Sequence, residues 1–339
     1  MGMGHIMRVE TLARTFYAHD FEVNVIIPAF EEGLTHIRQT LGDKINVIAV
    51  DTSYAESSVL PQEFPRGDVA VFDCLRNPPH RLRQARTKTS CVVVFDDEGE
   101  GVYEADLSFN PLYLPQFSRV ELATKRVKLF DEPKYMPLRE EFFRFRDRWR
   151  RADDERKQKR LLLLQGGVDG WNGIIRILSM IDRVRKDIVV VPVTGAAYLH
   201  EEELKRTISE LEIIVDWQKG VRRMSEVMVN CDAAISGCGL SIFELLCMGI
   251  PSLALTDESK EVHTAARLQQ RGCLINLGLL KALDDKSLAV GLSQVLDNEN
   301  KRDALTRSAR EAVDGKGAEY VVEEVLSYMK ENIHSYGVG

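Results

Sequence analysis

The sequence predicts an α/β protein made of two doubly wound domains. Short apolar segments of strand length alternate with longer amphipathic segments along the 339 residues, as they do where parallel strands are buried on both faces. The alternation occurs once on each side of a highly charged stretch, so we expect two parallel sheets, each covered by helices. The length also suits two domains better than one.

The expected elements follow from the apolar segments and from the glycine and proline residues between them. In the first half we expect a helix over about 6–17, a helix over 33–41, and strands at 22–28, 47–50, 69–72 and 91–95. In the second half we expect strands at 160–165, 188–193, 213–215, 233–236 and 252–256. The helices expected between them cover about 171–184, 201–211, 221–230, 241–248 and 262–271.

A charged stretch separates the two series. Residues 144–160 read RFRDRWRRADDERKQKR, with nine basic and four acidic side chains. A basic run could bind phosphate or nucleic acid, but mixed signs are more typical of a solvated helix or linker. We therefore expect a first domain over 1–150 and a second over 151–317. Apolar residues at helical spacing within 318–339 predict a C-terminal helix that packs back on the first domain.

The composition argues against several classes of protein. Forty-five basic and 52 acidic side chains give a net charge of −7, whereas nucleic-acid binding needs a basic surface. No apolar run approaches the ~18 residues of a membrane span, and the N-terminus lacks a signal-peptide core, so we expect a cytoplasmic protein without stable membrane insertion. The six cysteines include no C-x-x-C pair, so neither a disulfide framework nor a zinc site is expected.

The first chemical motif is Gly2-Met3-Gly4-His5-Ile6-Met7-Arg8, at a predicted helix start. Glycines there would let the backbone approach a ligand and direct free N–H groups at a negative charge. The motif is not a dinucleotide fingerprint, because Met7 stands where a third glycine belongs and no strand precedes it. The helix dipole disfavours the charged form of His5, so His5 could accept a proton, or it could simply cap or pack.

The second motif, Cys231–Glu244, reads CDAAISGCGLSIFE. An apolar strand ends in Gly237-Cys238-Gly239, and a helix is expected to begin at Ser241, which is a good N-cap residue. This is a second candidate phosphate site, at the carboxyl edge of the second sheet. Glu244 could bind the hydroxyls of a ribose, or form a capping box with Ser241. A third glycine turn, Gly166-Gly167, is expected to face the same crevice.

A pair of carboxylates, Asp96–Asp97, follows the strand expected at 91–95. Such a pair could bind a metal, but at a strand end it more often caps the next turn, and no cluster of ligand residues accompanies it. We expect neither a metal nor a cofactor.

These motifs, in this order, resemble those of the nucleotide-sugar hydrolases of pseudaminic acid biosynthesis (the PseG-like family), within the superfamily that includes the transferase MurG. The resemblance covers most of the chain and implies a GT-B architecture, with two Rossmann-like domains facing a cleft. The matching segments are Gly2–Arg8 with Thr11–Ala13, Asp96–Asp97, Lys134–Phe142, Gly166–Asp169, Met224–Met228 and Asp232–Pro251.

In that family a UDP-linked deoxyamino sugar is hydrolysed at its anomeric carbon, and the histidine of the glycine motif is the base. The resemblance implies this role for His5. The residues it implies in nucleotide or substrate binding are Gly4, Arg8, Gly166, Gly167, Gly237, Gly239, Leu240, Ser241, Glu244 and Ser259. Those it implies on the sugar side are Asp96, Asp97, Tyr135 and Arg139.

The chemistry agrees with this assignment. UDP is a weakly basic leaving group that needs no general acid, and backbone N–H groups at a helix start can stabilise its developing charge. One neutral histidine then suffices to activate a water on the opposite face of the sugar, and a single displacement inverts the anomeric centre.

The sequence departs from the family at two places. Relatives have a strand ahead of the glycine–histidine loop, whereas this sequence starts inside the loop, so either the first strand is missing or the start of the sequence is assigned late. Without that strand, the first sheet is expected to have an open edge. Relatives carry Asn-Gln after the strand that ends near Thr256, and here Ser259 and Lys260 occupy these places. Lys260 could pair with phosphate, although a lysine that faces the solvent is more common.

We therefore expect hydrolysis of a UDP-sugar in nonulosonic acid or surface-glycan biosynthesis. The main alternative is a GT-B glycosyltransferase, in which a sugar hydroxyl replaces water at the same donor site. A further alternative is a protein that binds a nucleotide-sugar without turnover, since the first strand and the Asn-Gln pair are absent.

Overall fold

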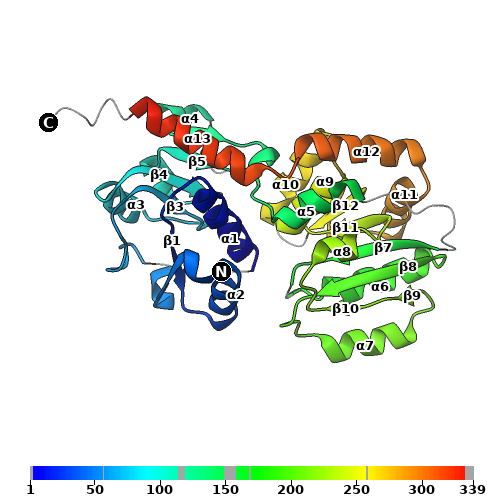
Figure 1. The fold of residues 1–339 in the computed structure, drawn as a ribbon. Coiled ribbons are helices and arrows are strands. Elements are labelled where there is room, and N and C mark those ends of the chain that lie inside the picture. Colours follow the sequence, from blue (N-terminus) through cyan, green and yellow to red (C-terminus); the bar gives the residue numbers. More distant parts are fainter. Residues whose placement is uncertain are drawn as a thin grey trace. The chain divides into compact units, whose positions relative to one another are not determined.

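The chain folds into two α/β units (Figure 1). The computed structural model describes residues 3–55, 57–113, 119–148, 158–167, 169–256 and 259–332. Unit 1 consists of Met1–Arg139 and Lys316–Gly339, and unit 2 of Glu140–Gly315. The described strand pairs of both units are parallel, which confirms the predicted fold class.

Unit 1 contains two parallel sheets. The first pairs β1 (Asn24–Pro28) with β2 (Asn46–Val50). The second has the order β3 (Gly67–Phe72), β4 (Thr89–Phe95), β5 (Leu107–Phe109) and β6 (Lys128–Phe130). The sequence does not predict β5 and β6, because segments this short show no periodicity. None of the described strands lies between β1 and β3. Among the described strands, β1 is therefore an edge strand of the first sheet and β3 an edge strand of the second.

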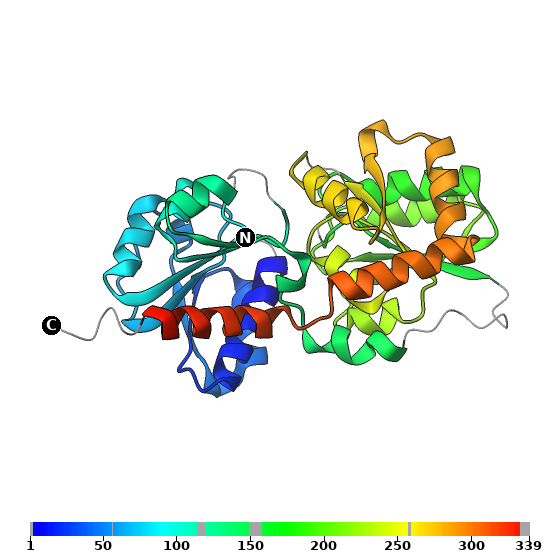
Figure 2. The ribbon, with the colours of Figure 1, turned by 90° about the horizontal axis from the view of Figure 1, so that it is seen from above.

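Helix α1 (Met3–Ala18) packs against both sheets of unit 1. Ile6 and Ala13 belong to the apolar cluster of β1, whereas Leu12 and Phe16 belong to that of β4 and β5. Helix α13 (Gly317–Asn332) completes the second cluster and contacts α1 and β4 (Figure 2). The remaining helical segments are α2 (Glu31–Leu41), η1 (Gly42–Lys44), η2 (Thr52–Ala55), α3 (Pro79–Arg86), η3 (Glu100–Glu104), α4 (Arg119–Thr124) and η4 (Pro133–Tyr135).

Unit 2 contains one parallel sheet in the order β10-β8-β7-β11-β12-β13, with β9 beside β8. Its strands are β7 (Lys159–Leu164), β8 (Ile188–Thr194), β9 (Ile214–Val215), β10 (Gln218–Lys219), β11 (Ala233–Ser236), β12 (Ser252–Thr256) and β13 (Ile275–Leu279). Its helical segments are α5 (Glu140–Phe145), η5 (Arg146–Arg148), α6 (Gly173–Val184), α7 (Glu201–Glu210), α8 (Met224–Met228), α9 (Leu240–Met248), α10 (Ser259–Gln270), η6 (Leu280–Ala282), α11 (Asp285–Leu296) and α12 (Glu299–Ala312).

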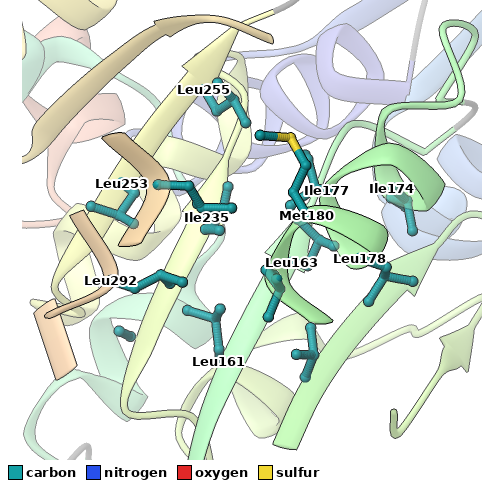
Figure 3. Close-up of a cluster of buried hydrophobic side chains, with 14 of the residues drawn as sticks. Leu161, Leu163, Ile174, Ile177, Leu178, Met180, Ile235, Leu253, Leu255 and Leu292 are labelled. Carbon is teal, nitrogen blue, oxygen red and sulfur yellow. The ribbon is translucent and has the colours of Figure 1, made fainter. Parts of the chain in front are cut away.

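The core of unit 2 explains why its strands are continuous apolar runs. Leu161 and Leu163 of β7 lie in one cluster with Ile177 of α6 and Leu292 of α11 (Figure 3). Leu162, whose side chain points to the opposite face of the sheet, is also fully buried. Because both faces are covered, every position of the strand must be apolar.

The division between the units lies before the boundary predicted at residue 150. Phe142 of α5 is fully buried. Ser225 donates a hydrogen bond to Glu141 over 2.7 Å, and Arg310 donates one to the carbonyl of Arg146 over 2.7 Å. These contacts attach α5 and η5 to unit 2, whereas their charged composition resembles a linker. Much of the charged stretch, residues 149–157, lies outside the described residues.

The six cysteines are all described, and none forms a disulfide. Burial raises the pKa of the Cys91 thiol to about 12, so Cys91 serves as a small buried apolar residue. No helix in the described ranges is long and apolar enough to span a membrane.

Candidate functional site

The first candidate site lies at the start of α1. This helix begins at Met3, so Gly4 and His5 belong to its first turn, and the start predicted near residue 6 is wrong. His5 therefore projects from a helix rather than from a loop. Gly2 lies outside the described residues.

Asp73, directly after β3, binds His5. Nδ1 of His5 lies 2.8 Å from Oδ1 of Asp73. Burial acts to raise the pKa of Asp73, but Arg8 and His5 lower it to about 2, so this carboxyl group is ionised at neutral pH. A carboxylate can only accept a hydrogen bond, so Nδ1 of His5 donates, and in the neutral form of the imidazole the lone pair is then on Nε2. The pair can therefore take a proton at Nε2.

Arg8 joins Asp73 to Asp96, which follows β4. Its Nε donates to Oδ2 of Asp73 over 2.8 Å, and its terminal nitrogens donate to Asp73 and Asp96. Burial acts to lower the pKa of Arg8, but the two carboxylates raise it above its usual value. Arg8 is only 4% exposed. It is therefore a buried cation, held next to Asp73 by its hydrogen bonds to the two carboxylates.

Asp97 has different partners from Asp96. It accepts hydrogen bonds from the backbone and side-chain amides of Asn77, over 3.0 and 2.9 Å, and from the N–H of Gly99 over 2.8 Å. Burial raises its pKa to about 6 in spite of these bonds. Asp97 thus ties together the loops that follow β3 and β4. Within the described part of the chain, no group of three or more His, Cys, Asp or Glu side chains could hold a metal ion.

Tyr135 lies in the apolar core of unit 1. Its ring meets those of Phe109 and Phe130 edge-on, at centroid distances of 5.3 and 5.2 Å. Its hydroxyl donates to Glu324 over 3.1 Å. These contacts give Tyr135 a structural role in place of the implied sugar contact. Arg139 is half-buried, at the last residue of the first segment of unit 1.

The second candidate site is the Gly-x-Gly turn after β11. The N–H of Gly237 donates to the carbonyl of Leu164 over 3.1 Å. Gly239 is extended and occupies the cap position, and α9 begins at Leu240. The prediction of Ser241 as the N-cap is therefore wrong, because the extended backbone of Gly239 already ends the turn. Gly239 has no side chain to cap the helix, so the first N–H groups of α9 need another acceptor.

The neighbouring glycine turn, after β7, serves a helix that has its own cap. Asp169 accepts hydrogen bonds from the N–H groups of Gly173 and Ile174 over 2.8 and 3.0 Å, which fills the start of α6. The N–H of Gly195 donates to the carbonyl of Gly167 over 2.8 Å. This hydrogen bond connects the turn after β7 to the turn after β8. Of these two helix starts, α9 is the better place for an external anion.

A carboxylate from α10 lies against the turn after β11. Oε2 of Glu261 accepts a hydrogen bond from the N–H of Cys238 over 3.3 Å. Burial and this carboxylate raise the pKa of the Cys238 thiol. Glu244, on α9, is only 5% exposed, so its contact with a ribose stays a prediction. The side chains of Ser259 and Lys260, and all of Val168 and of residues 257–258, lie outside the described part of the chain.

Two of these residues, Asp73 and Glu261, are not predicted from the sequence. Asp73 follows an apolar strand directly, as Asp96 does, and the rule that ligands bind at the carboxyl ends of parallel strands could have found it. Glu261 belongs to no motif, and only the fold brings it to Cys238.

Comparisons with known proteins support the architecture. No family model matches the sequence. The chain is 26% identical to the spore coat polysaccharide biosynthesis protein SpsG of Bacillus subtilis over 337 residues, 93% of this chain and 91% of SpsG. The structure of MurG from Acinetobacter baumannii is similar, with a TM-score of 0.63 and 13% identity over 96% of this chain and 97% of MurG.

Spinosyn forosaminyltransferase SpnP is similar at a TM-score of 0.61 and 14% identity, over 95% of this chain and 96% of SpnP. The chain has the GT-B fold. This agrees with the fold expected from the sequence, and at such identities the likeness to solved structures concerns the fold alone.

Proposed function

We propose that this protein is an enzyme that transfers a glycosyl group from a UDP-sugar donor to a hydroxyl group in the biosynthesis of a glycan. The name of the relative SpsG refers to polysaccharide biosynthesis, and SpnP, which has a similar fold, is named as a transferase of a sugar. Both names support the alternative that the sequence left open more than they support hydrolysis.

The main support from the structure is the His5–Asp73 pair. Nδ1 of His5 is held by an ionised carboxylate over 2.8 Å, so Nε2 is the atom that can take the proton of an acceptor hydroxyl. Asp73 fixes the tautomer of His5 and stabilises the imidazolium that forms. Arg8 keeps Asp73 ionised and in place through a bidentate pair.

In this proposal, unit 2 binds the leaving group. The N–H groups at the start of α9, around Gly239 and Leu240, would hold a phosphate of UDP and stabilise the charge that develops on it. The acceptor oxygen attacks the anomeric carbon, and the bond to the diphosphate oxygen breaks with its electron pair on UDP. The proton of the acceptor passes to Nε2 of His5. A single displacement of this kind inverts the anomeric configuration.

Hydrolysis of a UDP-linked deoxyamino sugar is the second candidate. Its support is the ordered set of motifs shared with the PseG-like hydrolases, which includes His5 and the turn at Gly237. The same base at Nε2 would act on water in place of a sugar hydroxyl, and all other steps would be the same.

The test is the release of UDP from a panel of UDP-sugars, with and without candidate acceptor sugars. Transfer predicts release that depends on an acceptor, and hydrolysis predicts release without one. The His5→Ala variant is expected to lose at least about 100-fold in rate. The His19→Ala variant, which removes the histidine that pairs with Glu319 just after α1, is a matched control and is expected to keep wild-type activity. Binding of UDP without turnover of any sugar, or equal rates for wild type and His5→Ala, would contradict the proposal.

A further inference from the structure

Asp96, which directly follows β4, is a carboxylate with no exposed surface. Its relative exposure is 0%. Oδ2 accepts a hydrogen bond from a terminal nitrogen of Arg8, and Oδ1 accepts one from the N–H of Leu112 over 3.2 Å. Because it is fully buried, Asp96 cannot reach a substrate, and the sugar contact that the resemblance implies for it is not available. Any influence of Asp96 on a reaction therefore passes through Arg8.

The backbone and a neighbouring ring hold the contact between Asp96 and Arg8 in place. Asp96 has a φ angle of 46°, in the left-handed region that asparagine and aspartate adopt more readily than other side chains. Its N–H donates to the carbonyl of Phe109 over 2.8 Å. The guanidinium group of Arg8 lies 5.2 Å from the centroid of the Phe95 ring, in a cation–π contact. The positions of both charges are thus fixed.

Asp96 determines the net charge of the group around His5. The pKa of Asp73 is about 2, so Asp73 is ionised, and its charge cancels that of the Arg8 cation. Burial raises the pKa of Asp96, while Arg8 and the N–H of Leu112 act to lower it. Both oxygens of Asp96 accept hydrogen bonds, which is the role of an ionised carboxylate. The three side chains together therefore carry one negative charge in excess, which a proton on His5 would neutralise.

Other titratable groups near α1 leave this balance unchanged. Burial raises the pKa of the Cys74 thiol, beside Asp73, to about 11, so the thiol is neutral at physiological pH. Glu31 and Glu32, at the start of α2, are exposed, and solvent and salt screen their charges. Further charged side chains around α1 have partners of their own: Glu10 with Arg14 and with His36 of α2, His19 with Glu319 of α13, and Asp97 with Asn77 and Gly99.

We propose that Asp96 is a positioning residue for the proton transfer: it holds Arg8 and offsets its charge, so that His5 beside Asp73 remains an effective base. This inference rests on the proposed function, in which Nε2 of His5 takes the proton of the acceptor and the electron pair of that O–H bond stays on the acceptor oxygen. Without the second carboxylate, Arg8 would cancel the charge of Asp73. The imidazolium formed in the reaction would then be a cation without a compensating charge.

The Asp96→Asn variant removes this charge and keeps a side chain that suits the left-handed backbone. The imidazolium of His5 is then less stable, so His5 binds its proton only at lower pH. We expect the acid limb of the pH profile of kcat to move to lower pH by about one unit. On the plateau, kcat is expected to fall about threefold, because a weaker base takes the proton more slowly. The KM of the UDP-sugar is expected to stay the same.

Two measurements test the inference, and the second needs no substrate. The first is the pH profile of UDP release. The second is an NMR titration of the ring protons of His5, assigned by comparison with His5→Ala. Asp106→Asn is the matched control, because Asp106 is also a buried carboxylate paired with an arginine, Arg86, over 2.9 Å. Asp106 precedes β5 and so lies at the opposite end of the parallel sheet from Asp96, and its variant is expected to behave as the wild type in both measurements.

Thermal melting shows whether each variant is folded. Asp96→Gly is a second variant, since glycine adopts a positive φ readily, and the same shift is expected for it. It replaces Asp96→Asn if that variant does not fold.

The outcomes separate the inference from the proposed function. A lower midpoint of the His5 titration and of the acid limb in the Asp96 variant, but not in Asp106→Asn, supports the inference. A loss of kcat that is equal at every pH, with His5 titrating as in the wild type, overturns it, because Asp96 would then only hold the fold. Absence of UDP release by the wild type from any sugar overturns the proposed function, and the NMR titration still decides whether Asp96 acts on His5.

Discussion

Oδ1 of Asp73 accepts a hydrogen bond from Nδ1 of His5 over 2.8 Å, although the two residues are 68 positions apart in the sequence. The bond joins the end of β3 to the first turn of α1. It assigns the tautomer of His5, because the carboxylate cannot donate. A histidine of otherwise ambiguous role thereby becomes a candidate base with a defined proton-accepting atom.

The Asp73→Asn variant is expected to lose about 100-fold or more in kcat with little change in KM. An asparagine amide can donate to Nδ1 of His5, which would favour the tautomer whose Nε2 carries the proton and cannot act as a base. The measurement is steady-state release of UDP at a temperature where melting shows the variant to be folded. The exposed Asp51→Asn variant is the control, and a wild-type kcat for Asp73→Asn would contradict the assigned role.

Arg8 is expected to dominate the stability of this region. Replacement of Arg8 by Met would leave Asp73 and Asp96 buried without their cation, which costs about 3–5 kcal/mol in the free energy of unfolding. Arg14, on the same helix, is half-exposed and pairs with Glu10, so Arg14→Met is expected to cost less than about 1 kcal/mol. Urea titrations of both variants check this contrast, and similar losses for the two would contradict it.

The sequence revealed the larger part of the fold because buried parallel strands leave a local signal. The strand expected at 188–193 matches β8, Ile188–Thr194, where nearly every residue is apolar. β5, which is only Leu107–Phe109, has too few residues for any pattern. The boundary between the units was also misplaced, because the burial of Phe142 depends on contacts with distant helices.

The candidate site was less predictable than the fold. His5 and the turn at Gly237 were found from local glycine patterns, but their partners Asp73 and Glu261 come from other elements. Whether side chains on a helix and at the end of a distant strand meet depends on the topology of the sheet. That topology cannot be read from a single sequence. Tyr135 shows the opposite error, since its motif suggested a ligand contact and its ring lies in the core.

Asp97 predicts a pH dependence of stability. Burial raises its pKa to about 6 in the folded chain, whereas an unfolded aspartate has a pKa of about 3.9. The folded state therefore binds this proton more tightly than the unfolded state does. The protonated carboxyl group contributes its whole stabilisation below about pH 4, and this contribution to the free energy of unfolding decreases as the pH rises through about 6. The total decrease is about 3 kcal/mol.

We expect the Asp97→Asn variant to lack this part of the pH dependence. The difference in the free energy of unfolding between wild type and variant should fall between about pH 4 and pH 7, as measured by urea titrations across that range. Asp51 is the control, because its hydrogen bonds with Ser53 lower its pKa, and its removal should produce no such fall. A difference for Asp97→Asn that is constant with pH would show that its carboxyl group has an ordinary pKa.

Gly195 is expected to control the shape of the carboxyl edge in unit 2. A Cβ atom at this position would lie 2.5 Å from the carbonyl oxygen of Gly167 and 3.0 Å from its carbonyl carbon. Both atoms belong to backbone, so Gly195→Ala must push the turn after β7 away from that after β8, at a cost of about 1–3 kcal/mol in the free energy of unfolding. Since the resemblance to the PseG-like family implies Gly166 and Gly167 in nucleotide binding, UDP affinity is expected to fall as well. Gly170→Ala is the matched control, because a Cβ there meets nothing within 4 Å. Thermal melting and UDP titration of the two variants check the prediction, and equal behaviour of Gly195→Ala and Gly170→Ala would mean that the two turns are free to separate.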